Sequence, residues 1–245
     1  MRVFLPNLLV FVAGFAGTMA FRTAPLTTTR TTTRSVPTGL SSTASSADVQ
    51  SEIDSKLFLL KSAAETKQED SDDVVAALLD LEKLSRQAAK LDTAYAEKML
   101  QSLNGSWRLV FTTGTVNTQK KVGKINYFPL KAVQSFDTTD MKIENGIYFG
   151  DFCALKFSGD FSFDLKKRKL EFDFDNICVL QTFDVKLKNG EAANLGAKSG
   201  LGSESNVANA AKDKSAFFNW ISADESIATA RGGGGGLALW KRVVD

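Results

Sequence analysis

Hydrophobic residues recur at helical spacing between positions 48 and 103. Asp48 can cap a first helix, and Ser71 can cap a second one after the polar break at residues 68–71. Residues Tyr95, Met99 and Leu103 indicate a third helix. The apolar positions of the first two helices are Ile53, Leu57, Leu60, Val74, Val75, Leu78, Leu79 and Leu81. We therefore expect a helical stem over residues 48–103.

After Asn104 the apolar residues alternate with polar ones instead. A period of two places successive side chains on opposite faces of a strand. The pattern predicts strands at 107–111, 122–128, 131–137, 142–149, 152–158, 161–165, 170–175, 178–187, 215–222, 226–231 and 236–243. Short strands with no helical interruption favour a closed or nearly closed antiparallel barrel over residues 104–245. A barrel of about eight strands can hold one small ligand.

The clearest predicted hairpin has a basic tip. Its turn contains the four consecutive basic residues Lys166, Lys167, Arg168 and Lys169. These cations could contact anionic lipid headgroups, or they could form a plain solvated turn. On the second strand, Glu171, Asp173 and Asp175 share one face, which we interpret as the solvated face of the hairpin rather than a metal site.

Two glycine-rich segments punctuate the strands. Residues 189–213 lack a strand pattern, so we expect a long mobile loop there, with a flap over the barrel mouth as the functional alternative. Residues 232–236 are five glycines followed by a strand pattern. A phosphate-binding loop needs a following Lys-Ser/Thr and a helix, so this run is predicted to be a turn between the last two strands.

The first 47 residues have the features of a targeting leader. An apolar run at 8–16 is too short to span a bilayer and ends near small residues, which is typical of a signal peptide over residues 1–20. Residues 21–47 are rich in Ser, Thr and Arg, contain no acid, and begin with Phe21. This order resembles the bipartite leader of algae with secondary plastids, which implies import into a plastid. A disordered polar linker would have the same composition.

The amino-acid composition excludes several kinds of catalytic and metal-binding site. The 245 residues include no histidine, which excludes Ser-His-Asp and Cys-His nucleophiles and every His-ligated metal site. Two cysteines, Cys153 and Cys178, cannot form a disulfide framework. They fall in neighbouring predicted strands and could meet as a redox-sensitive pair, but we expect two buried free thiols. We therefore predict no catalytic residue, no metal and no cofactor.

The net charge of +2 belongs to the leader. Without the four arginines that precede position 47, 26 basic residues face 28 acidic ones. A nucleic-acid-binding protein normally shows a basic excess, so no nucleic acid partner is expected. The chain has 18 phenylalanines, which would fill a core or line a barrel that receives an apolar ligand.

Four segments resemble the plastid lipid-associated proteins, the fibrillins of plastoglobules and thylakoids. The segments are residues 103–113 (LNGSWRLVFTT), 128–147 with FPLKAVQSF and IENGI, 157–175 with FSGDF and LEFDFD, and 224–240 with DE, RG and GGLALW. They follow the order of the family and span about residues 74–243. The resemblance implies a mainly β fold, a lipocalin-like antiparallel β-barrel preceded by a short α-helical stem.

The resemblance also implies a site. In the lipocalin pattern a Gly-x-Trp on the first strand lies beneath an arginine, so Gly105 and Trp107, with Arg231 or Arg242, are expected to close one end of the barrel. The residues expected to face a ligand in the barrel interior are Trp107, Phe111, Phe136, Phe161, Phe163, Phe172 and Phe174.

The predicted function is that of a non-enzymatic protein that binds a lipophilic small molecule or lipid. Its partner surface would be a plastoglobule or thylakoid membrane. One alternative is an isomerase or cyclase acting on a lipophilic substrate, with Tyr127, Tyr148 or Cys153 as its candidate reactive groups. Another is a scaffold that binds photosynthetic proteins through the helical stem.

Overall fold

The computed structural model describes residues 46–114, 119, 126–188, 190–198, 204–212 and 214–244. The leader predicted over residues 1–47 lies almost entirely outside these ranges. None of the helices in these ranges combines the length and the hydrophobicity that a membrane-spanning helix requires.

Among the described residues, three helices precede the strands, as predicted. They are α2 (Ser46–Thr66), α3 (Ser71–Leu91) and α4 (Tyr95–Leu103). The expected cap of the second helix is wrong by one residue. The carboxylate of Asp70 accepts the backbone N–H groups of Asp72 and Asp73, and Ser71 is already helical. Aspartate is as good a cap as serine, and its position here lets it reach both orphan donors.

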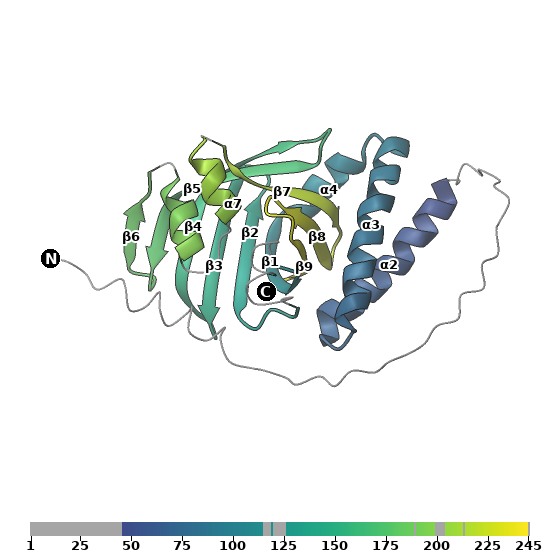
Figure 1. The fold of residues 1–245 in the computed structure, drawn as a ribbon, viewed down its shortest axis with the longest axis horizontal. Helices are drawn as coiled ribbons and strands as arrows, with labels where there is room; N and C mark the ends of the chain where they lie inside the picture. Colours follow the sequence, from purple (N-terminus) through teal and green to yellow (C-terminus); the bar gives the residue numbers. More distant parts are fainter. Residues whose placement is uncertain are drawn as a thin grey trace.

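In the part of the chain that the structure describes, nine antiparallel strands follow, and eight of them close into a barrel (Figure 1). The closed order is β1-β2-β3-β4-β5-β7-β8-β9, with β9 returning to β1, and β6 adds to the free half of β5. The strands are β1 (Gly105–Thr112), β2 (Lys131–Asp137), β3 (Lys142–Phe149), β4 (Phe152–Asp164), β5 (Lys169–Val179), β6 (Phe183–Lys186), β7 (Ala216–Ala223), β8 (Ile227–Gly232) and β9 (Leu237–Arg242). The predicted antiparallel barrel is confirmed.

Some strand boundaries differ from the prediction. The two strands expected at 152–158 and 161–165 are one strand, β4, whose pairing with β5 shifts register at a bulge between Ser158 and Gly159. A Cβ at Gly159 would lie 2.0 Å from the backbone oxygen of Asp173, so only glycine permits this close approach. Of the strand expected at 122–128, Tyr127 forms a single bridge to Phe111, and residues 120–125 lie outside the described ranges.

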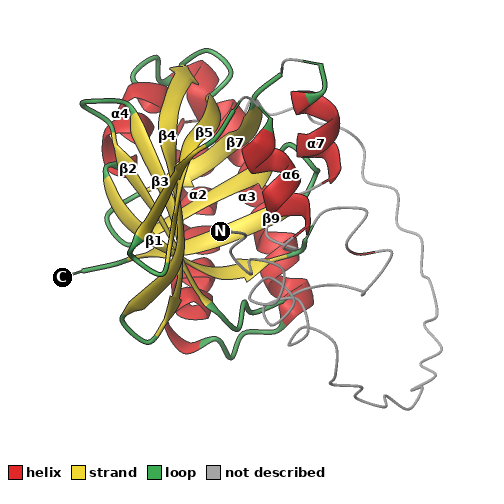
Figure 2. Cartoon of the chain, turned by 90° about the vertical axis from the view of Figure 1, so that its left-hand side faces the viewer, coloured by secondary structure: helices red, strands yellow, loops and turns green. Residues whose placement is uncertain are grey.

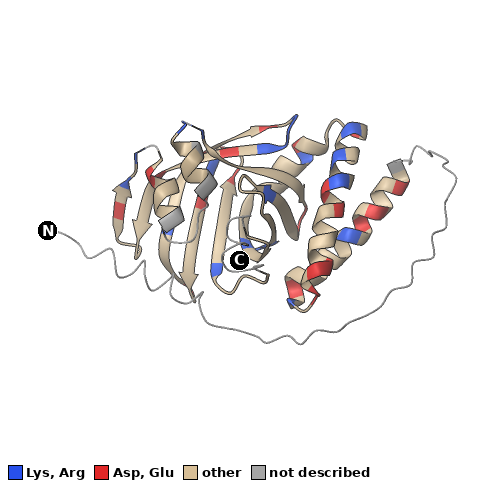
Figure 3. Ribbon diagram, viewed as in Figure 1, with Lys and Arg blue, Asp and Glu red and all other residues tan. Residues whose placement is uncertain are grey.

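The stem packs on the outside of the barrel. Helix α2 contacts β8 and β9, and α3 contacts β7, so both helices cover one side of the sheet (Figures 1 and 2). The shared apolar core between helices and strands includes Leu60, Leu78, Leu81, Phe111, Ile221, Ile227 and Leu239. Along α2 and α3 basic and acidic side chains are interspersed (Figure 3).

Within the loop expected at 189–213, the described residues form two short helices instead. They are α6 (Glu191–Lys198) and α7 (Glu204–Ala210). The loop prediction is therefore wrong for these residues. Ala192 is buried against Phe157 and Ile177 of the barrel, and such tertiary packing stabilises short helices whose own sequence is a weak signal.

Candidate functional site

One end of the barrel interior is filled with side chains. The aromatic rings of Phe136, Phe161, Trp220 and Trp240 meet here at centroid separations between 5.4 and 5.9 Å. Their neighbours in the same buried cluster include Trp107, Ile143, Leu170, Ala228 and Ala230. This end of the barrel therefore leaves little room for a ligand.

The side chain of Arg242 covers the filled end of the barrel from outside. The guanidinium carbon of Arg242 lies 4.1 Å from the ring centroid of Trp107, and its nitrogens donate to the carbonyl oxygens of Ser102, Asn104 and Glu225 at 2.6 to 2.8 Å. Gly105 has a φ of +108°, and a Cβ there would lie 3.0 Å from Nη1 of Arg242. The Gly-x-Trp and the arginine thus form one structural unit.

Arg231, the other arginine considered for this role, lies elsewhere. Its guanidinium binds the carboxylate of Glu82 on α3 at 2.6 and 3.0 Å, and it donates to the carbonyl oxygen of Gly235 at 2.8 Å. This hydrogen-bonded pair lowers the pKa of Glu82 below its ordinary value. Arg231 therefore connects the stem to the barrel and does not cover Trp107.

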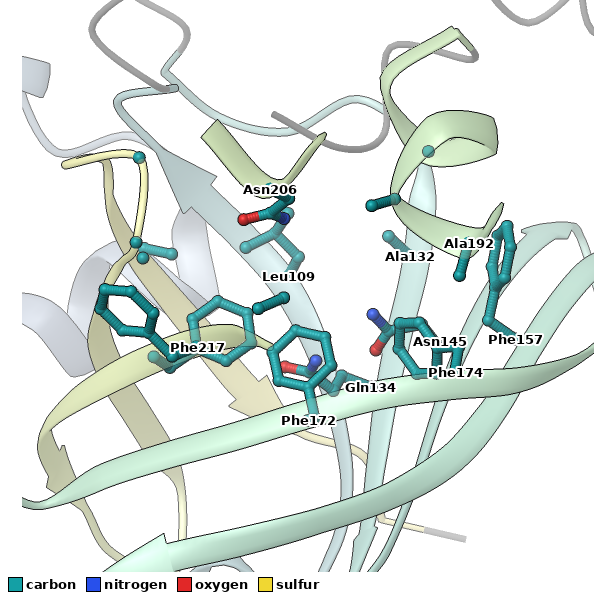
Figure 4. Close-up of a pocket in the computed structure, with 18 of the residues that line it drawn as sticks. Leu109, Ala132, Gln134, Asn145, Phe157, Phe172, Phe174, Ala192, Asn206 and Phe217 are labelled. Carbon is teal, nitrogen blue, oxygen red and sulfur yellow. The ribbon is translucent and has the colours of Figure 1, made fainter. Parts of the chain in front are cut away.

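A cavity of about 350 Å³ occupies the opposite end of the barrel. Its walls are mainly aromatic and small side chains from several strands, including Leu109, Phe157, Phe172, Phe174, Phe217, Phe218, Ala238 and Trp240 (Figure 4). Pockets of this size and apolar character are typical of small-molecule sites. The barrel is hollow at this end and filled at the other.

Helices α6 and α7 lie over the mouth of this cavity. Ala192 and Gly196 of α6, with Asn206 and Ala210 of α7, contribute to its lining (Figure 4). Beneath these helices, strands β5 and β7 separate. Strand β5 pairs with β7 only as far as Phe172, and from Asn176 onward it pairs with β6 instead. Helices α6 and α7 therefore supply a cover over this opening.

The glycine run forms part of the rim. As predicted, it is a turn, here between β8 and β9. The Gly232 N–H donates to the Gly236 oxygen at 2.8 Å, and Gly235 has a φ of +84°. A Cβ at Gly233 would lie 3.0 Å from the Phe217 ring, so the small residue lets that ring face the cavity.

Besides Asn206 of the covering helix α7, two amide side chains on the barrel strands interrupt the apolar wall. Gln134 on β2 and Asn145 on β3 are cross-strand partners and both line the cavity. The Gln134 side chain is buried, with 5% of the residue exposed. The oxygens Oε1 of Gln134 and Oδ1 of Asn145 are buried and have no hydrogen-bond partner. Two unsatisfied acceptors in an apolar wall are costly, so they need an explanation.

The charged residues that contribute to the lining are Asp173 and Lys214. Burial is the main reason that the pKa of Asp173 is raised. The rest of the lining is uncharged, which favours a neutral ligand over an ion.

The seven residues expected to face a ligand divide into three groups. Phe172 and Phe174 line the cavity. Trp107, Phe136 and Phe161 belong to the filled end, and Phe163 packs against it while partly exposed.

Phe111 is the exception, because it points out of the barrel. A bulge between Leu109 and Phe111 shifts the alternation by one residue, so Leu109 faces the cavity and Phe111 packs beneath the stem. A one-residue shift moves a side chain to the other face, which explains why the period of two misplaced it.

Only part of the basic tip is available to contact a membrane. Lys166 and Lys167 are exposed, but the Arg168 guanidinium lies 5.9 Å from the Tyr95 ring centroid and donates to the Ser85 hydroxyl. Lys169 binds Glu171 at 2.6 Å and lies 4.5 Å from the centroid of the Phe217 ring. Lys167 also pairs with Asp164 at 3.2 Å, so three of the four predicted membrane contacts are engaged within the protein.

The candidate groups for an enzyme lie outside the cavity. The Tyr127 hydroxyl donates to the Glu69 backbone oxygen at 2.8 Å, and burial raises its pKa. Tyr148 and Cys153 border a separate surface depression, with Glu144, Lys156, Cys178 and Gln181. Both cysteines are free and partly exposed, rather than buried. Among the described residues, no group of three or more Cys, Asp or Glu side chains is arranged to hold a metal ion.

The two amides and the Glu82–Arg231 pair were not predicted from the sequence. A signal for Gln134 exists, because period two places it on the same face as Ala132 and Phe136. No comparable local signal exists for Glu82 and Arg231, which are 149 residues apart.

Comparison with known proteins identifies one family. The PAP_fibrillin family model matches residues 54–239, which include most of the stem and nearly all of the barrel. Neither the curated proteins nor the solved structures include a match.

Proposed function

The chain belongs to the PAP_fibrillin family of plastid lipid-associated proteins, and we propose that it binds one lipophilic small molecule in the open end of its barrel. The protein would carry or store this molecule at a plastoglobule or thylakoid surface without transforming it. The observation that carries the proposal is the apolar cavity of about 350 Å³ beneath α6 and α7.

Extraction and substitution test this proposal directly. The full chain, purified from a plastid-containing host, is expected to yield a stoichiometric lipophilic compound by mass spectrometry. Ala132 points into the cavity (Figure 4), so Ala132→Phe should reduce the bound compound severalfold by filling its space. Ala208 is exposed on α7, and Ala208→Phe is the matched control. Wild-type protein with no bound or exchangeable lipid would reject the proposal.

We also propose that a cluster of exposed apolar side chains contacts the lipid surface. This apolar edge consists of Phe149, Phe152, Leu180, Phe183 and Val185. Phe149 pairs with Phe152, and the Leu180 N–H donates to the oxygen of Ala154, so the two turns are neighbours. Both lie towards the cavity end of β3 and β4, where Ile147 and Phe157 line the cavity. Exposed apolar patches commonly mark interaction surfaces.

The basic tip provides the competing membrane contact, and vesicle flotation separates the two. Phe149→Ser combined with Phe183→Ser should reduce flotation with neutral vesicles severalfold, because apolar insertion does not need anionic lipid. Phe58 is 79% exposed on α2, so Phe58→Ser is the matched control. If Lys166→Glu with Lys167→Glu abolishes binding and the Phe variants do not, the tip is the contact instead.

A further inference from the structure

We propose that the ligand of this cavity carries a hydroxyl group, held between Gln134 and Asn145, on a neutral apolar body. This inference rests on the proposed function and specifies the chemical class of the ligand. The observation behind it is the pair of buried amide oxygens that have no partner in the protein, one of which the hydroxyl proton would satisfy while the hydroxyl oxygen accepts from an amide NH₂ group.

The two amides are placed to act together. Their residues are directly opposite each other in the β2–β3 ladder, where Cβ atoms of partners lie about 4.5–5.5 Å apart. Both side chains project from the strands into the same cavity (Figure 4). A single hydroxyl seated between them can therefore reach either amide.

A hydroxyl matches the chemistry of an amide pair. It donates to an amide oxygen, and its own oxygen can accept from an amide NH₂ group. An ether or a ketone can accept but cannot donate, so it would leave both oxygens unsatisfied. A carboxylate would place a negative charge beside two carbonyl acceptors, and it would also lose its hydration in an apolar wall.

The remaining walls of the cavity would contact the apolar part of the ligand. Phe172 and Phe174 lie beside the amides, while Phe217, Phe218 and Trp240 line the cavity on the side of β7 and β9. Aromatic walls bury aliphatic or aromatic groups well, and a few polar groups fix the orientation of a ligand. The hydroxyl would thus point to β2 and β3, with the apolar body against the phenylalanines.

Matched probes test the inference in the full chain. After delipidation, 1-dodecanol, its methyl ether and dodecanoate are titrated against tryptophan fluorescence, since Trp240 lines the cavity. The alcohol should bind roughly tenfold more tightly than the ether, as expected for one buried hydrogen bond. It should also bind more tightly than the carboxylate at neutral pH.

Variants then assign the preference to the amides. Gln134→Met with Asn145→Leu should reduce the alcohol-to-ether ratio to about one while leaving ether affinity within about threefold. The same variant should unfold at an equal or higher urea concentration without ligand, because it removes unsatisfied polar groups. Gln101 is exposed on α4, and Gln101→Met is the control that should preserve the ratio.

The outcomes separate the two proposals. Equal binding of alcohol and ether by the wild-type chain would overturn this inference alone and would indicate that water satisfies the amides. Failure of all three probes, and of the extracted lipids, to bind would overturn the proposed function as well. The wild-type comparison distinguishes these outcomes even if the double variant does not fold.

Discussion

The guanidinium carbon of Arg242 lies 4.1 Å from the ring centroid of Trp107, and the two side chains close one end of the barrel. Trp107 comes from the first strand of the barrel and Arg242 from the last. The contact therefore fastens the closing β1–β9 pair, beyond the hydrogen bonds of the ladder. A cation over an indole face is the most favourable of the common cation–π pairs.

Replacement of Arg242 should weaken the fold substantially. Arg242→Ala removes the cation–π contact and leaves the carbonyls of Ser102, Asn104 and Glu225 without their donor. We expect a loss of about 2–4 kcal/mol in the free energy of unfolding, measured in urea by tryptophan fluorescence. Arg242→Lys keeps the charge but not the planar fork, so its loss should be intermediate. An unchanged urea midpoint for Arg242→Ala would contradict the closing role.

Replacement of Gly105 should also destabilise the fold, but for a different reason. Gly105→Ala adds a Cβ that meets the Arg242 guanidinium at 3.0 Å, on a backbone whose φ of +108° disfavours any side chain. We expect a loss of about 2–3 kcal/mol. Gly150 also has a positive φ, +62°, but open space around its Cβ, so Gly150→Ala isolates the backbone cost of about 1 kcal/mol. Equal losses for both variants would show that the arginine contact adds nothing.

Local patterns in the sequence predicted the stem and most strands, because helical and strand periods are properties of short segments. These patterns failed to predict features that depend on contacts between residues far apart in the sequence. The bulge that turns Phe111 outward, the packing of Ala192 that stabilises α6, and the Glu82–Arg231 pair all depend on contacts between segments far apart in the chain. A ligand in the barrel interior was predicted, but the position of its cavity was not, since alternation cannot distinguish the filled end at Phe161 from the open end at Phe172.

The Glu82–Arg231 pair should make stability depend on pH. The hydrogen bond from Arg231 lowers the pKa of Glu82 in the folded state, relative to about 4.3 in an unfolded chain. The folded protein therefore holds this group deprotonated more strongly. Its stabilising contribution is complete above the unfolded-state pKa and is lost as the pH falls through the folded-state value.

The test compares wild type with Glu82→Gln across that range. At pH 7 the variant should lose about 1–3 kcal/mol, because Glu82 is only 12% exposed and Arg231 would keep a partly buried charge without its counterion. The difference between the two proteins should shrink below about pH 4. Arg86 also contacts Glu82 but is 61% exposed, so Arg86→Ala should change stability little. A difference that stays constant with pH would exclude the ionised pair as its source.

The cover over the cavity should control ligand exchange rather than global stability. Ala192 is buried against Phe157 and Ile177, so Ala192→Asp would place a charge in an apolar contact and detach α6 from the barrel. We expect a preloaded fluorescent lipid to dissociate roughly tenfold faster in stopped-flow displacement, corresponding to about 1.4 kcal/mol of lost docking. The urea midpoint should change little, since α6 lies outside the barrel and the stem and can open by itself. Ala208→Asp makes the same change at an exposed position of α7 and should leave the rate unaltered. If both variants release lipid at the wild-type rate, the ligand must leave by a route that does not pass beneath α6.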